Sequence, residues 1–140
     1  MKSFKLVPIF LIFCGLCHAQ TDWKFDGKTL ELSNRKLHRV IHLAGDSVIS
    51  EGLFLAGRSE NYLRGKSPEF QFLLNEKTVN GWTGWKTVSC EPLSDEHQGT
   101  GAAWKVKGLG PAEGLELTVS YLLYPDLPLV RKWLTFSNKS

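Results

Sequence analysis

The stretch from Leu115 to Phe136 constrains the fold of this chain more than any other. Its first half carries apolar residues at every second position, with polar residues between them: Leu115, Leu117, Val119, Tyr121 and Leu123 alternate with Glu116, Thr118 and Ser120. Because successive side chains of a strand point to opposite faces, this period of two predicts a half-buried antiparallel strand. The stretch therefore indicates a β fold.

A second strand is predicted after a corner bounded by prolines. Pro125 and Pro128 flank Asp126, and they end the first ladder because proline has no N–H to donate and fixes its own φ. Beyond the corner, the apolar residues again alternate with others: Val130, Leu134 and Phe136 lie opposite Arg131, Trp133 and Thr135. We expect both strands to supply the core of the domain and surface for packing against other domains.

The rest of the chain repeats this β pattern on a shorter scale. Turn signals such as Asp26-Gly27 and Asn80-Gly81 recur at intervals of about 8–12 residues, which is typical of sandwiches and barrels. Residues 57–67 are predicted to form a long exposed loop, and residues 91–101 are the most loop-like stretch. After the first 19 residues, no window of helical length shows sustained apolar residues at i, i+3, i+4 and i+7. We predict one domain, all-β, built as an antiparallel sandwich over residues 20–140.

We expect this sandwich to be incomplete. Residues 137–140 have turn chemistry directly after an apolar strand, where a hairpin partner would follow. An apolar strand at an open edge is a pairing and aggregation liability. The sequence therefore predicts part of a larger β module.

The first 19 residues read as a signal peptide. Lys2 and Lys5 form a positive region, residues 6–16 are an apolar run too short to span a membrane comfortably, and small residues precede a cleavage site between Ala19 and Gln20. We expect export to the periplasm or the extracellular space. A lipoprotein is disfavoured because neither Cys14 nor Cys17 follows a small residue.

Removal of the predicted signal peptide leaves a net charge near zero and one cysteine, Cys90. Without Lys2 and Lys5, 15 of the 17 basic residues remain against 14 acidic ones. A near-neutral chain gives no electrostatic reason to expect nucleic acid as a partner. Cys90, alone, forms neither an internal disulfide nor a metal cluster, and we interpret it as a buried small hydrophobe. No cofactor is expected.

Three tryptophans are candidate sugar contacts. Trp82 and Trp85 flank a Thr-Gly pair after Gly81, and Trp104 follows downstream. Flat rings in glycine-rich turns can stack on the apolar face of a sugar. The alternative is that they pack in the core, because aromatic side chains carry large buried areas.

The other candidate groups are interpreted as ordinary surface or packing residues and not as catalytic or metal sites. Glycoside hydrolysis needs two carboxylates at a fixed separation, yet nothing selects a pair among the acids Glu69, Glu91, Asp95, Glu96 and Glu113, which we interpret as solvated loop charges. His38 and His42 share a strand face without a third ligand, so no metal site is predicted. Residues 138–140 match the N-glycosylation pattern.

Three strings together resemble a known family. They are Leu37-His38-Arg39-Val40-Ile41, Ser67-Pro68-Glu69-Phe70-Gln71-Phe72, and Tyr124-Pro125-Asp126-Leu127-Pro128-Leu129-Val130-Arg131-Lys132-Trp133-Leu134 with Asn138. Their order and spacing resemble the N-terminal β-supersandwich domain of glycoside hydrolase family 36 α-galactosidases. The resemblance covers most of residues 37–138.

The resemblance implies a sandwich related to galactose mutarotase, followed in full enzymes by a catalytic (β/α)₈ barrel that carries both catalytic aspartates. The barrel lies outside this sequence, so no catalytic residue is predicted here. The implied partners are the barrel, an α-galactoside or another carbohydrate, and a homo-oligomer. Two alternatives remain: a free-standing carbohydrate-binding module, favoured if the three tryptophans are exposed and coplanar, and a mutarotase-like epimerase, which requires His38 or His42 to meet Glu69.

Overall fold

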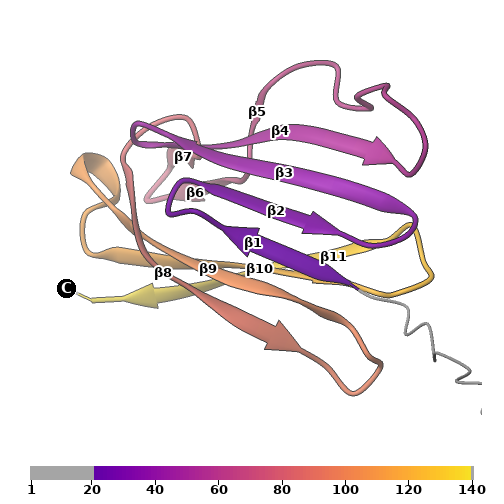
Figure 1. The fold of residues 1–140 in the computed structure, drawn as a ribbon. Coiled ribbons are helices and arrows are strands. Elements are labelled where there is room, and N and C mark those ends of the chain that lie inside the picture. The colour runs from indigo at the N-terminus through magenta and orange to yellow at the C-terminus, as the bar shows by residue number, and fades with distance from the viewer. Residues whose placement is uncertain (1–20, 140) are drawn as a thin grey trace, which may run out of the picture.

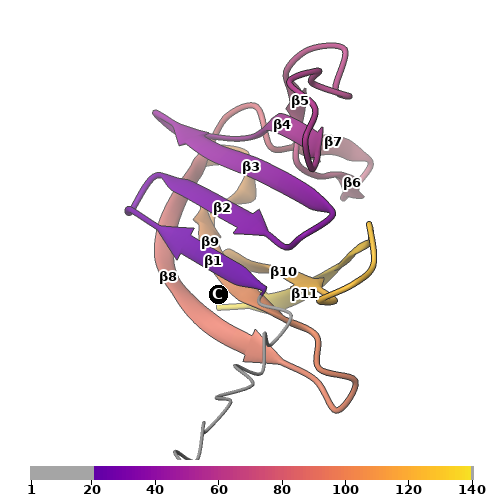
Figure 2. The same ribbon diagram turned by 45° about the vertical axis from the view of Figure 1, so that its right-hand side comes forward.

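The computed structural model describes residues 21–139, and these form three antiparallel sheets. The predicted signal peptide and its predicted cleavage site lie among residues 1–20, outside the described residues. Two of the sheets face each other as the layers of a sandwich, and a small hairpin lies at one end of it (Figures 1 and 2). The expected all-β sandwich is therefore confirmed.

The first layer is a sheet of five strands in chain order. They are β1 (Asp22–Phe25), β2 (Thr29–Ser33), β3 (Leu37–Ala44), β4 (Ser47–Leu55) and β5 (Ser67–Pro68). The Asp26-Gly27 turn joins β1 to β2 as predicted: the Asp26 carboxylate accepts hydrogen bonds from the backbone N–H groups of Lys28 and Thr29. These bonds lower the pKa of Asp26, because they favour its ionised form.

The second layer and the hairpin complete the domain. The second sheet contains β8 (Trp85–Ser94), β9 (Thr100–Gly108), β10 (Leu115–Leu123) and β11 (Val130–Asn138), in the order β11-β10-β9-β8. A short 3₁₀ helix, η1 (Gly110–Ala112), lies between β9 and β10, and β6 (Gln71–Leu74) pairs with β7 (Lys77–Asn80) as the hairpin. No helix in residues 21–139 is long and apolar enough to cross a membrane.

The alternating apolar residues predicted within residues 115–123 line one side of the core. Leu117, Val119, Tyr121 and Leu123 are at most 1% exposed, and they face Leu30, Ile41 and Val48 of the first sheet within one apolar cluster. Strand β11 pairs along the whole length of β10, and Val130 and Leu134 pack against the same cluster. In residues 21–139 only β10 pairs with β11, so β11 is an edge strand.

Two predicted loops are shorter than expected. Strand β8 continues to Ser94, which shortens the predicted loop over residues 91–101 to a turn; Pro92 is accommodated because β8 is an edge strand. Ser137 and Asn138, predicted as a turn, continue β11 by pairing with Glu116 and Leu115.

Leu117→Ala tests the role of the β10 alternation. Leu117 is fully buried, so we expect the substitution to lower the free energy of unfolding by about 2–5 kcal/mol, measured by chemical denaturation. Leu73→Ala is the matched control, since Leu73 is 73% exposed and its loss should change stability by less than about 0.5 kcal/mol. Equal midpoints for the two variants would exclude Leu117 from the core.

Candidate functional site

The carboxylate of Glu69 is buried between the two sheets. The chain bends at Glu69, immediately after β5, so that both Glu69 and its neighbour Phe70 point inward. The Glu69 side chain has no solvent-exposed surface. This corrects the interpretation of Glu69 as a solvated loop charge.

Four side chains satisfy this carboxylate, two from each sheet. From the first sheet, Arg39 Nη2 lies 3.0 Å from Glu69 Oε2, and the Ser50 hydroxyl donates to the same oxygen. From the second sheet, Lys132 Nζ lies 2.8 Å from Oε1 and the Tyr121 hydroxyl donates to Oε1 at 2.9 Å. We call these five residues the Glu69 cluster.

The strands place each partner by their alternation. Arg39 shares the inward face of β3 with Leu37 and Ile41, and its guanidinium also donates to Gly52 O and Ser50 Oγ at 3.1 and 2.5 Å. Lys132 lies between Val130 and Leu134 on β11, directly opposite Tyr121 of β10. A basic residue at an inward position on each sheet is the sequence signal that could have revealed a buried acid.

The Glu69 cluster is a closed network without a binding cavity. No buried side-chain nitrogen or oxygen in residues 21–139 lacks a hydrogen-bond partner. Two cations and one carboxylate give the cluster a net positive charge, and the side chains of Arg39 and Lys132 reach solvent, at 12% and 33% exposure. The geometry makes the cluster an electrostatic link between sheets, since a buried charge must be paired and hydrogen-bonded.

Burial changes the acidity of two groups in this region. The pKa of Tyr121 is raised well above its ordinary value by burial, and the adjacent Glu69 carboxylate raises it further. The pKa of Cys90 is raised to about 12 by burial and by Glu91. The Cys90 thiol, half-buried against the core, is therefore protonated at neutral pH.

The three candidate sugar-contact tryptophans do not share a surface. Trp85 and Trp104 are 1% and 0% exposed, and their indole N–H groups donate within the fold, to Asn80 O and Thr87 Oγ1. Phe70 packs edge-on to Trp85, with ring centroids 4.9 Å apart. Only Trp82 is exposed, at 42%. Trp85 and Trp104 are thus core residues, and the coplanar exposed platform that would favour a carbohydrate-binding module is not formed.

The histidines lie apart from Glu69. His38 Nε2 is 3.4 Å from Glu31 Oε2, and its ring stacks on Phe54, while His42 Nδ1 shares a hydrogen bond with Thr29. The histidine–carboxylate pair required for a mutarotase-like epimerase is not assembled. Among residues 21–139, no group of three or more histidine, cysteine, aspartate or glutamate residues could hold a metal ion.

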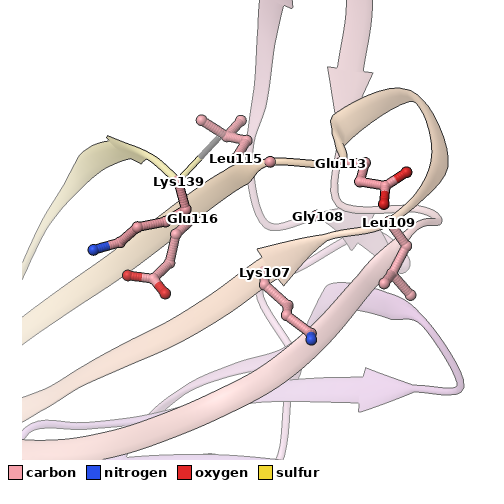
Figure 3. Close-up of a pocket in the computed structure, with 8 residues that line it drawn as sticks. Lys107, Gly108, Leu109, Glu113, Leu115, Glu116 and Lys139 are labelled. Carbon is pink, nitrogen blue, oxygen red and sulfur yellow. The ribbon is translucent and has the colours of Figure 1, made fainter.

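A polar hollow of about 220 Å³ lies beside the connection from β9 to β10 (Figure 3). Its rim carries Lys107, Glu113, Glu116 and Lys139, so its charges are balanced. The Glu116 carboxylate pairs with Lys105 of the neighbouring strand, with 3.7 Å between Nζ and Oε1, and is therefore partly neutralised within the sheet. The hollow has neither a convergent set of ligands nor a buried polar group aimed into it.

Comparisons with protein-family models, with curated proteins and with solved structures found no match to this chain.

Glu69→Gln tests the electrostatic link. The amide of the variant carries no charge, so it cannot neutralise Arg39 and Lys132. Because breaking a buried ion pair costs about 3–5 kcal/mol, we expect a lower free energy of unfolding. The loss should fall in the lower part of that range, since both cations have partial access to solvent. Glu96→Gln is the matched control, because the Glu96 side chain is 87% exposed. Both variants are compared by urea denaturation, and equal unfolding midpoints would contradict the role assigned to Glu69.

Tyr121 should remain protonated at a pH that ionises an ordinary tyrosine, about 10. Since its pKa is higher in the folded state, stability is retained below that pH and lost as pH rises above it. Tyrosinate absorbance during an alkaline titration should show one late step that coincides with unfolding, and this step should be absent in Tyr121→Phe. A late step that persists in the variant would assign it to another residue.

Proposed function

We propose that this chain is a non-catalytic accessory β-sandwich domain, or a fragment of one, from an exported α-galactosidase-like glycoside hydrolase. It supports a catalytic (β/α)₈ barrel and the enzyme's oligomer. The proposal includes export through a signal peptide ending at Ala19. On this proposal the chain by itself has no hydrolase activity.

One observation carries the proposal: the three strings that resemble the family 36 domain converge on the Glu69 cluster. The first string contributes Arg39, the second Glu69, and the third Lys132. These residues are 30 and 63 positions apart in sequence, yet their charged groups are in direct contact. The three strings are therefore parts of one contact in the fold, which supports interpreting them together and not as three unrelated short likenesses.

The location of the ionisable groups supports a non-catalytic domain. The acid at the centre of the cluster is enclosed and fully partnered, so it is not available to a substrate. Two of the three candidate aromatic rings serve the core. A supporting domain needs a stable core and contact surfaces, and β11 leaves a nine-residue edge with Phe136 half-exposed.

A tryptophan fluorescence titration of the chain with galactose and raffinose tests the proposal. We expect no saturable shift and no release of nitrophenol from p-nitrophenyl α-galactoside. Trp82→Phe is the control variant, because Trp82 is the exposed ring among the three candidates. A saturable shift in the wild-type chain that disappears in Trp82→Phe would instead identify a carbohydrate-binding module.

Sequencing of the locus supplies the positive test. We expect in-frame or adjacent coding sequence with the strand–helix repeats of a (β/α)₈ barrel. A locus without such coding sequence would remove the proposed parent enzyme.

A further inference from the structure

An apolar groove lies at the corner where three turns of the sandwich meet. It has a volume of about 530 Å³ and is lined by His97, Tyr124, Pro125, Leu127, Leu129 and Arg131. In Figure 1 the β2–β3 and β10–β11 turns lie side by side at the right-hand end of the molecule, and the β8–β9 turn lies below them at the same end. We call this feature the corner groove.

Hydrogen bonds from side chains hold the three turns in place. Asn34, in the β2–β3 turn, donates to Tyr124 O and Leu127 O at 2.6 and 2.9 Å. Its own amide oxygen accepts from the N–H groups of Lys36 and Leu37 at 2.8 and 2.9 Å. One asparagine thus fixes the β10–β11 turn against the β2–β3 turn, which gives the groove a defined shape before anything binds.

The third turn is attached through Asp95. Its Oδ2 accepts a hydrogen bond from the Tyr124 hydroxyl at 2.8 Å, and its Oδ1 accepts from the backbone N–H groups of His97 and Gly99 at 3.0 and 2.8 Å. Partial burial would raise the pKa of Asp95, but the bonds from Tyr124, Gly99 and His97 outweigh it and lower that pKa. Asp95 is therefore an ionised structural acceptor and is not available to a ligand.

Because the polar side chains of the turns bond to one another, the groove is lined by apolar surface and by one cation without a carboxylate partner, Arg131. Leu127 and Leu129, which line the groove, are 51% and 49% exposed. Two other acids lie near the groove, and both are paired within the chain: Asp126 with Arg35, and Glu96 with His97. Arg131 lies over the Trp133 ring, 5.1 Å from its centroid, and no carboxylate in residues 21–139 lies within ion-pair distance of it.

We propose that the corner groove docks a partner protein through an apolar side chain, such as leucine or phenylalanine, with an adjacent carboxylate that pairs with Arg131. The apolar walls and the single unpaired cation define this chemistry. A sugar fits less well, because its hydroxyls need polar partners and Asp95 is committed. A second copy of this chain fits less well, because a symmetric contact through this groove would bring two Arg131 side chains together.

This inference rests on the proposed function in one respect: both require that the chain acts through protein contacts. The groove is a surface distinct from the Glu69 cluster, so it can be tested by itself. The probes are two peptides, acetyl-Glu-Leu-Phe-Leu-amide and its neutral counterpart acetyl-Gln-Leu-Phe-Leu-amide. They are titrated into the ¹⁵N-labelled chain while backbone amide shifts are recorded.

We expect saturable shifts at Leu127, Leu129 and Arg131, and about 2–5-fold tighter binding of the acidic peptide, as an exposed ion pair provides. Leu127→Ser and Leu129→Ser should abolish the shifts, whereas the control Leu73→Ser, on the β6–β7 hairpin, should bind as wild type. Arg131→Gln should remove the preference for the acidic peptide and Arg131→Lys should retain it.

Equal binding of the two peptides, or shifts confined to other residues, would overturn the inference. Raffinose that moves the same groove amides would show a sugar site in place of a protein-docking site. A dimer in sedimentation experiments that is lost in Leu127→Ser would show that a second copy is the occupant. Failure of the peptides alone leaves the proposed function standing, because that proposal is tested by the response to sugars and by the locus.

Discussion

The desolvated carboxylate of Glu69 is the constraint on which the rest of the sandwich depends. An ionised acid with no exposed surface is tolerable only where charged and hydrogen-bonding partners surround it. Arg39 and Ser50 come from one sheet, Tyr121 and Lys132 from the other, so satisfying this one acid fixes the relative position of the two layers. Apolar packing alone tolerates small sliding, whereas bonds to two oxygens of one carboxylate specify a single alignment.

The same requirement explains how the edge strand β11 is retained. Its outer side has no strand partner in residues 21–139, and Phe136 is half-exposed. Lys132 nevertheless crosses to the first layer, where it contacts both the carboxylate and the backbone oxygen of Glu69. Phe136 adds an edge-on contact with Phe72, with ring centroids 4.9 Å apart. An edge strand is thus held from its inner face and keeps its other side available for contact.

Sequence periodicity predicted the architecture and failed at single buried polar groups. The apolar alternation over residues 115–123 marks the face that lines the core and is readable without a structure, whereas the burial of Ser120 and Leu122 on the opposite face is not. Glu69 was missed because its burial depends on a bend and on partners up to 63 residues away. For Trp104 the sequence leaves a sugar contact and core packing as alternatives, and its alternation with the buried Ala102 and Val106 decides for the core. The corner groove could not be predicted, because its lining combines His97 of the β8–β9 turn with the stretch from Tyr124 to Arg131, which only the fold brings together.

The spread of the Glu69 cluster along the chain has a consequence for biosynthesis. Arg39, Ser50 and Glu69 leave the ribosome first, while Tyr121 and Lys132 emerge 52 and 63 residues after Glu69. Until then the first sheet has a carboxylate with half of its partners missing and an apolar face without its opposite layer. The domain is therefore expected to fold as one unit after synthesis of β11, with the first half exposed to chaperones while translation continues.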